Sequence, residues 1–168
     1  MPKILPLVIY PSPVLRNKTR EIGIEELQQP KIQQLILDMK KTMLESDGIG
    51  LAAIQVGENI RLAVINTSDG VLALVNPIII SKSFRKSIGD EGCLSVPGVF
   101  GLVKRPIKIR IQAIDSKGKE VKFTAAGMFA RVIQHEVDHL DGILFIDRVK
   151  KITIGQDILK KMRAKDSH

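Results

Sequence analysis

The sequence contains one cysteine, one tyrosine and no tryptophan in 168 residues. Because Cys93 has no second cysteine to pair with, an intramolecular disulfide is excluded, and a reducing, cytoplasmic location is expected. No run of about 18 apolar residues occurs, so we expect no transmembrane helix. The first residues also lack the sustained apolar stretch and the small-residue cleavage site of a secretory signal.

Aromatic residues make up only 4% of the chain, whereas its formal net charge is +8. Such a charge favours weak association with polyanions, including nucleic acids or the ribosome. The lysines and arginines are scattered along the sequence, however, and few aromatic side chains are there to stack on bases. The charge is therefore a weak sign of specific nucleic-acid recognition.

Hydrophobic residues make up 44% of the chain and charged residues 26%, as in an ordinary globular protein. A chain of this length buries a substantial core. No internal repeat, low-complexity tract or interdomain linker stands out. We therefore expect residues 1–168 to form a single domain.

Three segments have the apolar spacing of helices. The first begins near Pro30, which suits a first-turn position, and ends at the loop that Gly48 and Gly50 open. The second spans residues 127–140, and a basic third helix spans residues 156–165. The positions expected to face the core are Ile32, Leu35, Ile36, Met39 and Met43 in the first helix and Ile158, Leu159 and Met162 in the third.

The middle of the chain has the pattern of strands joined by tight turns, and residues 5–15, punctuated by Pro11 and Pro13, are expected to run extended over the surface. The pattern predicts an α+β fold with short mixed or antiparallel sheets around a central helix, and a C-terminal helix. The expected hairpins are residues 61–65 with 71–75, across a turn at 68–70, and residues 107–113 with 120–124, across a turn at 116–118.

The central helix carries the segment Gln134-His135-Glu136-Val137-Asp138-His139. Histidines four residues apart lie on one helix face, so both imidazoles can reach a single metal ion. Glu136 is then positioned to act on a water bound to that metal. The alternative is a helix with two incidental polar histidines, although the only other histidine, His168, is the terminal residue.

A catalytic zinc site has three protein ligands and an open position for water. In the pattern HExxHxxGxxH the third ligand would stand where this chain has Phe145, which cannot ligate a metal. Cys93, which a metal would hold as the thiolate, is the better candidate, and the alternative for a lone cysteine is a small buried hydrophobe. Asp138 lies one position off the histidine face and is expected to be structural.

Three segments are similar to the motifs of one family, in the family's order. They are Gly48-Ile49-Gly50-Leu51-Ala52-Ala53-Ile54-Gln55 (GxGLAAxQ), Glu91-Gly92-Cys93-Leu94-Ser95 (EGCLS) and the histidine segment (QHExDH). The chain resembles the peptide deformylases throughout, including the Tyr10-Pro11 segment and residues 144–148. The resemblance implies a single catalytic domain that removes the N-formyl group from the N-terminal formyl-methionine of nascent polypeptides and releases formate.

Carried over by position, the resemblance implies that Cys93, His135 and His139 bind the metal. A metal-bound water would attack the formyl carbon, with Glu136 as general acid and base. In this family the metal is typically Fe²⁺, and Zn²⁺, Ni²⁺ or Co²⁺ can take its place. Thiolate and imidazole ligands are compatible with all four, so the sequence does not choose among them.

The resemblance also gives a role to the first motif. The formyl oxygen gains negative charge during hydrolysis, and the Gln55 side-chain amide and the Leu94 backbone N–H would donate to it. Gly50 would let the backbone approach the substrate closely, and Glu91 and Arg105 would pair and brace the cysteine loop or else have a plain surface role. The residues near the methionine pocket would be Ile49, Gly50, Leu94, Met128, Phe129 and Val132, some of which, Phe129 above all, could equally be core.

Two other functions remain as alternatives. A general HExxH metallopeptidase would use the same water and glutamate chemistry, but it should lack Gln55 and the cysteine loop. A basic nucleic-acid-binding protein with a structural metal would need a fourth ligand, and the only cysteine or histidine left is His168, the terminal residue. The basic C-terminal helix would contact ribosomal RNA, as it does in some relatives, or would simply be solvated.

Overall fold

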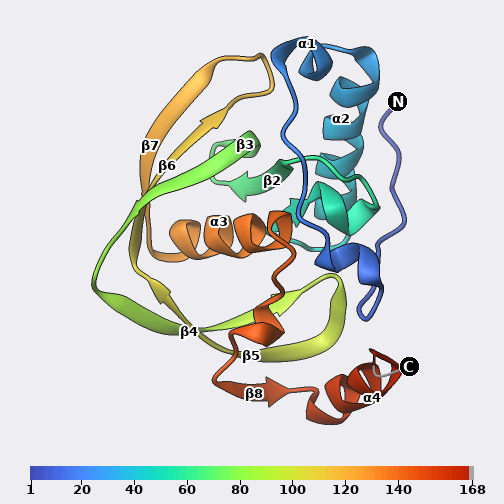
Figure 1. The fold of residues 1–168 in the computed structure, drawn as a ribbon, viewed down its shortest axis with the longest axis vertical. Coiled ribbons are helices and arrows are strands. Elements are labelled where there is room, and N and C mark those ends of the chain that lie inside the picture. The colour runs from blue at the N-terminus through green and yellow to red at the C-terminus, as the bar shows by residue number, and fades with distance from the viewer. Residues whose placement is uncertain (167–168) are drawn as a thin grey trace.

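Two antiparallel sheets lie on either side of helix α3 (Gly127–Leu140) in the computed structural model, which describes residues 1–166 (Figure 1). One sheet has the strand order β1-β2-β3-β6-β7 and the other β4-β5-β8. The α+β class with antiparallel sheets and a C-terminal helix is therefore confirmed. The strands are β1 (Gly50–Ala52), β2 (Leu62–Thr67), β3 (Gly70–Lys82), β4 (Lys86–Cys93), β5 (Val96–Pro106), β6 (Lys108–Ile114), β7 (Glu120–Ala126) and β8 (Lys151–Ile154). The remaining elements are the helices α1 (Ile24–Leu27), α2 (Pro30–Glu45) and α4 (Gln156–Asp166) and the 3₁₀ turns η1 (Pro13–Arg16), η2 (Ala53–Val56) and η3 (Phe145–Asp147).

Helix α2 begins at Pro30, as expected, and ends at Glu45, three residues before the first glycine of the following loop. Its apolar side chains recur at helical spacing and form one buried stripe. That stripe packs against β1 and β2 and belongs to the largest core cluster (Figure 1). All five positions expected to face the core are buried: Ile32, Leu35, Ile36, Met39 and Met43.

Both expected hairpins are present. Strands β2 and β3 pair antiparallel up to Thr67 and Gly70, and β6 pairs with β7 along its whole length. Strand β3 continues well beyond the expected segment and pairs with β6 on both sides of an irregularity between Val75 and Ile78. Asn76 lies within this irregularity with φ of 50°, a left-handed conformation that asparagine tolerates better than most residues.

The sequence pattern does not predict the β4–β5 hairpin. Strand β4 has two glycines and few apolar residues, so its alternation is weak, and its strand form follows from pairing with β5. In this pairing Gly92 lies opposite Phe100. A Cβ atom at Gly92 would stand 2.5 Å from the Phe100 ring, so a glycine is needed for the ring to lie on the strand.

The segment from Tyr10 to Leu15 packs near the C-terminal helix α4. Tyr10 and Leu15 are buried, although residues 5–15 were expected to run over the surface, and the Tyr10 hydroxyl donates a hydrogen bond to Asp166 in α4 (3.0 Å). In α4, Leu159 is fully buried, whereas Ile158 is 43% exposed, so its expected core position is wrong. No helix within residues 1–166 is long and apolar enough to cross a membrane. Residue 168 lies outside the described residues.

Two leucines of α2 provide a matched test of this packing. Leu35 is buried at 9% exposure, and Leu37 on the opposite side is 45% exposed. We expect Leu35→Ala to lower the free energy of unfolding by about 2–4 kcal/mol because it removes buried methyl groups and leaves a cavity. Leu37→Ala should cost less than about 1 kcal/mol. Urea denaturation of both variants measures the difference, and equal losses would contradict the assigned face of α2.

Candidate metal centre

Helix α3 carries His135 and His139 on one face, and their Nε2 atoms are 3.2 Å apart. The helix is buried without interruption from Ala130 to Leu140, so both imidazoles are shielded from solvent by the surrounding sheets. Phe145 stands where the HExxHxxGxxH pattern would have a third histidine ligand. Its ring stacks on that of His135, with 6.1 Å between ring centroids. The helix therefore presents two fixed nitrogen donors to one point.

The third donor comes from the end of β4. Cys93 is followed by a two-residue turn into β5, and this turn places its Sγ 3.2 Å from His139 Nε2. Within residues 1–166, Cys93, His135 and His139 form the one group whose donor atoms could hold a metal, and all three atoms lie within 4.8 Å of one another. Tetrahedral zinc would separate two imidazole nitrogens by roughly 3.3 Å and a nitrogen from a thiolate sulfur by roughly 3.5 Å, given its usual bond lengths. The three donors therefore fit a divalent ion.

The hydrogen bonds around the histidines set their protonation. His135 Nδ1 lies 2.9 Å from Glu91 Oε1, so Nδ1 carries the proton that this carboxylate accepts, and Nε2 faces His139. Burial acts to lower the pKa of His135, but its hydrogen bonds to Cys93 and Glu91 outweigh it and hold that pKa well above its usual range, so a metal would displace the Nε2 proton on binding. Burial, together with the nearby His135, holds the pKa of His139 well below its usual range. A neutral imidazole is the form that ligates a metal.

Glu136 is buried, and its Oε2 atom has no hydrogen-bond partner among the described residues. Burial raises the pKa of Glu136 to about 7, against the lowering effect of the nearby His135. The other oxygen, Oε1, lies against Gly50, where an added Cβ would stand 2.5 Å away. The structure thus holds a carboxyl group able to exchange protons near neutral pH beside three metal donors.

Gln55 reaches this cluster from η2. Its Oε1 accepts a hydrogen bond from the Ala52 N–H (2.9 Å), which turns its amide nitrogen toward Cys93 Sγ (3.4 Å) and Ser95 Oγ (3.1 Å). The Leu94 N–H, in the turn after Cys93, donates to no described residue. The Gln55 amide therefore lies beside the sulfur, and the Leu94 N–H follows Cys93 in the chain.

Glu91 is a buried carboxylate held from three directions. Arg105 donates to both of its oxygens (2.6 and 2.9 Å), Arg131 to Oε2 (2.8 Å) and His135 to Oε1. Burial acts to raise the pKa of Glu91, but these hydrogen bonds and the Arg105 charge outweigh it and hold that pKa well below its usual range. The expected pairing of Glu91 with Arg105 is confirmed. Asp138 is paired with Arg105 (2.9 Å) and Arg148 (2.7 Å), in keeping with its expected structural role.

Arg131 was not among the site residues expected from the sequence. Its guanidinium lies over Gly89, where a Cβ would stand 2.9 Å from Cζ, and it also donates to the Val103 carbonyl (2.9 Å). The signal that could have revealed it is its spacing, because residues 131, 135 and 139 are each four apart on the same helix face. A cation at the first of these positions, on a buried helix, calls for a partner such as Glu91.

The cluster opens into a cavity of about 510 Å³. Of the residues expected at the methionine pocket, Ile49, Gly50, Leu94, Met128 and Val132 line it, together with Phe100 and Arg131. Phe129 does not. Its ring stacks on Phe123 in a neighbouring core cluster, with 5.8 Å between ring centroids, so the structure places it outside this cavity.

Two imidazoles, a thiol and an unpaired buried carboxyl group in one open cavity are the side chains that metal-dependent hydrolases bring together. The family model described as polypeptide deformylase matches residues 4–154. The chain is also 41% identical, over 148 residues, to a peptide deformylase of Desulfitobacterium hafniense, a match that covers 88% of this chain and 96% of the relative. The chain therefore belongs to the peptide deformylase family, hydrolases that remove N-formyl groups from nascent peptides.

Solved structures agree with this assignment. A peptide deformylase from Synechococcus elongatus in complex with actinonin matches with a TM-score of 0.84 and 38% identity, covering 97% of this chain and 86% of the other. A class I type b peptide deformylase from Acinetobacter baumannii bound to Met-Ala-Ser matches with a TM-score of 0.84 and 33% identity, covering 89% and 100%. The family model ends before α4, which begins at Gln156.

Replacing Cys93 tests the three-donor site. We expect Cys93→Ala to lose most of its bound metal after dialysis because two imidazoles alone hold a divalent ion weakly. Met128→Ala, at a cavity position that is 63% exposed and offers no ligand in the site, is the matched control and should keep its metal. Elemental analysis measures both contents. Undiminished metal in Cys93→Ala would remove this sulfur from the site.

Replacing Arg131 tests the support of Glu91. We expect Arg131→Met to lower the free energy of unfolding by about 2–4 kcal/mol, since a buried carboxylate loses one of its paired cations. Arg110→Met, at an exposed position of β6, should change it by less than about 0.5 kcal/mol. Denaturant unfolding compares them. A neutral Arg131→Met would show that Arg105 alone satisfies Glu91.

Proposed function

We propose that the protein is a metal-dependent hydrolase that removes the formyl group from the N-terminal formyl-methionine of nascent polypeptides. The observation that carries this proposal is the position of Gln55, whose amide nitrogen lies 3.4 Å from Cys93 Sγ. A donor at this point is placed to stabilise charge on the oxygen of a carbonyl bound at the cluster. We further propose that residues 1–168 form a single catalytic domain.

The substrate would bind in the cavity with its methionine side chain against Ile49, Met128 and Val132. These side chains offer an apolar wall that suits an unbranched thioether. Gly50 leaves room for backbone groups beside Glu136, because a Cβ there would collide with the Glu136 carboxyl group. The formyl group, the smallest acyl group, would then lie over Cys93, His135 and His139.

Cys93, His135 and His139 would hold a divalent metal, which when bound lowers the pKa of water and polarises the formyl carbonyl. Glu136 accepts a proton from the attacking water and later passes it to the leaving amine, so the products are formate and a free N-terminus. The Gln55 amide and the Leu94 N–H donate to the oxygen that gains negative charge. Glu91 keeps the Nδ1 proton on His135, so that its Nε2 stays available as a ligand.

Fe²⁺ is our proposal for the metal in the cell, with Zn²⁺, Ni²⁺ or Co²⁺ able to bind the same donors. The choice of Fe²⁺ rests on the family resemblance, because a thiolate with two imidazoles accepts all four ions. Purification without oxygen followed by elemental analysis identifies the ion. A cytoplasmic location is likewise a proposal, supported by the unpaired thiol of Cys93. Weak contact of the basic helix α4 with the ribosome is proposed on its charge.

A general metallopeptidase is the competing function, because it would use the same glutamate and metal donors. The two are distinguished by offering formyl-Met-Ala-Ser and unformylated Met-Ala-Ser to protein purified without oxygen. We expect formate release from the first and no cleavage of the second. Cleavage of the Met–Ala bond without formate would instead favour the peptidase.

The role of Glu136 gives a kinetic prediction. Glu136→Gln should lower kcat for formate release by roughly 10²–10⁴-fold, since it removes the group that moves the proton. Its metal content should stay unchanged because the three donors remain. Glu25→Gln, at an exposed position, is the control with the same chemical change and should keep full activity. Near-normal turnover of Glu136→Gln would refute the assigned role.

A further inference from the structure

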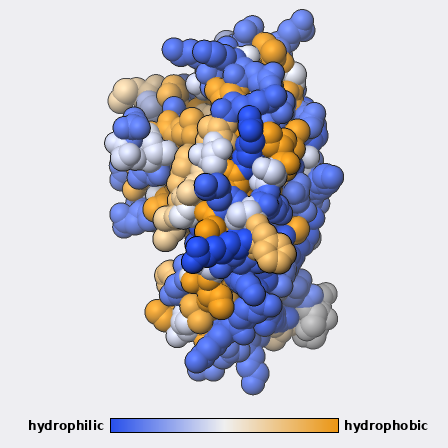
Figure 2. All heavy atoms as spheres, turned by 90° about the vertical axis from the view of Figure 1, so that its left-hand side faces the viewer, coloured by the Kyte–Doolittle hydropathy of each residue, from blue (hydrophilic) through white to orange (hydrophobic). Residues whose placement is uncertain are grey.

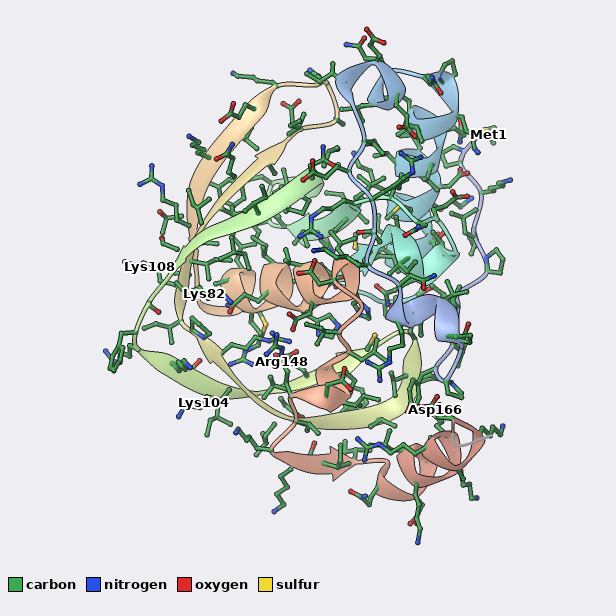
Figure 3. The ribbon with its side chains drawn as sticks, viewed as in Figure 1. Met1, Lys82, Lys104, Lys108, Arg148 and Asp166 are labelled. Carbon is green, nitrogen blue, oxygen red and sulfur yellow. The ribbon has the colours of Figure 1, made fainter. Side chains whose placement is uncertain are left out.

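A second cavity, of about 740 Å³, is lined by Arg105 and Asp138 and by none of the three metal donors. Its cationic lining residues are Lys82, Lys86, Lys104, Arg105 and Arg148, and we call this cavity the basic groove. They come from the end of β3, from the β4–β5 hairpin and from the segment after η3. Figure 3 shows Lys82, Lys104 and Arg148 around the space between the two sheets, with Lys108 beside Lys82. Cations that are scattered in the sequence therefore gather at one place.

The charge of the basic groove is poorly balanced. Asp138 is its one acidic lining residue, and its carboxylate is already held by Arg105 and Arg148. Lys82, Lys86 and Lys104 are exposed and form no ion pair with any described residue. Like charges gathered without partners repel one another, so a bound polyanion would relieve an existing cost.

The geometry of the hairpin strengthens this gathering of charge. Lys86 lies opposite Pro106 in the β4–β5 register, and Lys104 is two residues before Pro106 on the same strand. Residues two apart on a strand point to the same face, so Lys86 and Lys104 project from one side of the hairpin. Arg105, between Lys104 and Pro106, points to the other side, toward Asp138. The fixed Arg105 and Arg148 add donors with set directions, since both are hydrogen-bonded to Asp138.

An exposed aromatic ring stands at the rim of the basic groove. Phe84 lies in the short connection between β3 and β4, with a relative exposure of 102%, and it lines the same cavity as the lysines. Figure 2, which faces this side of the molecule, shows strongly hydrophilic atoms with hydrophobic atoms beside them. The chain has few aromatic residues, and this phenylalanine is fully exposed beside Arg85 and lysines, so it does not contribute to the core.

We propose that the basic groove binds a single-stranded segment of RNA, with the phosphates on its lysines and arginines and a base stacked on Phe84. Charge with an aromatic platform is the pairing that single-stranded nucleic acids use, because every base has a flat face. An acidic peptide would satisfy the lysines but would give Phe84 no flat ring to stack on. The choice of RNA over DNA rests on the family's action on nascent chains, which are made on RNA.

The test uses the full chain and a fluorescent 12-nucleotide oligouridine, with binding followed by anisotropy over a series of salt concentrations. We expect Lys82→Ala/Lys104→Ala to weaken binding at least tenfold at low salt. The slope of log affinity against log salt should fall by about 1.4, as for two lost phosphate contacts to a single strand. Phe84→Ala should weaken binding roughly fivefold or more, and Phe84→Trp should restore it.

The matched control is Lys117→Ala/Lys119→Ala, which removes the same charge from exposed positions of the β6–β7 turn. It should leave binding to oligouridine within about twofold of the parent. Formate release from a short formyl peptide should be unchanged in all of these variants, which shows that they are folded and keeps this test independent of the proposed catalysis. If the groove variants bind like the parent and only Lys160→Ala/Lys161→Ala in α4 loses binding, RNA binds α4 and the proposal is overturned.

Two further results would also overturn it. In the first, the parent binds phosphatidylserine vesicles or polyglutamate but shows no measurable RNA binding, and the groove variants lose that affinity. The other is equal affinity of Phe84→Ala and the parent for oligouridine, or equal affinity of the parent for double-stranded and single-stranded RNA. Preference for the single strand that depends on both Phe84 and the lysines would support it.

Discussion

The carboxylate of Glu91 joins the two parts of the structure that form the metal centre. It is buried in the β4–β5 hairpin and is satisfied only when Arg105 of β5 and Arg131 and His135 of α3 surround it. An unpaired buried carboxylate would cost several kcal/mol, so the packing of hairpin against helix that pairs it is strongly preferred. The same packing brings Cys93, two residues further along β4, to the histidines. Folding and assembly of the site thus share one electrostatic requirement.

The site also depends on two places where a side chain is missing. Gly50 allows β1 to lie directly against the Glu136 carboxyl group, and Gly92 allows the Phe100 ring to lie on β4. Any larger residue would move Glu136 or the ring, and with them the wall of the cavity. Glu136 keeps one oxygen without a protein partner, an arrangement that leaves this oxygen free for a reacting molecule.

The sequence predicts the helices and hairpins with regular apolar spacing well, because periodicity reports directly which face is buried. The histidine spacing and the single cysteine are local signals, so the sequence also singles out the three candidate donors that the structure brings together. The β4–β5 hairpin escapes prediction because its short, glycine-containing strand is defined by its partner. Arg131 and Phe129 fail for a related reason: which cavity a helix residue faces depends on elements distant in sequence. Likewise, the basic groove becomes visible only when residues 82, 104 and 148 come together in space.

Helix α3 has no solvent-facing residue between Ala130 and Leu140. Every substitution there disturbs either the core or the reacting groups, so this part of the protein offers almost no neutral variation. The cavity rim differs, because Ile49, Met128 and Phe100 are 55%, 63% and 40% exposed. Over evolutionary time the residues of the catalytic centre should stay unchanged, while those of the rim should vary. Directed evolution that aims to broaden the range of accepted peptides should therefore substitute residues at the rim.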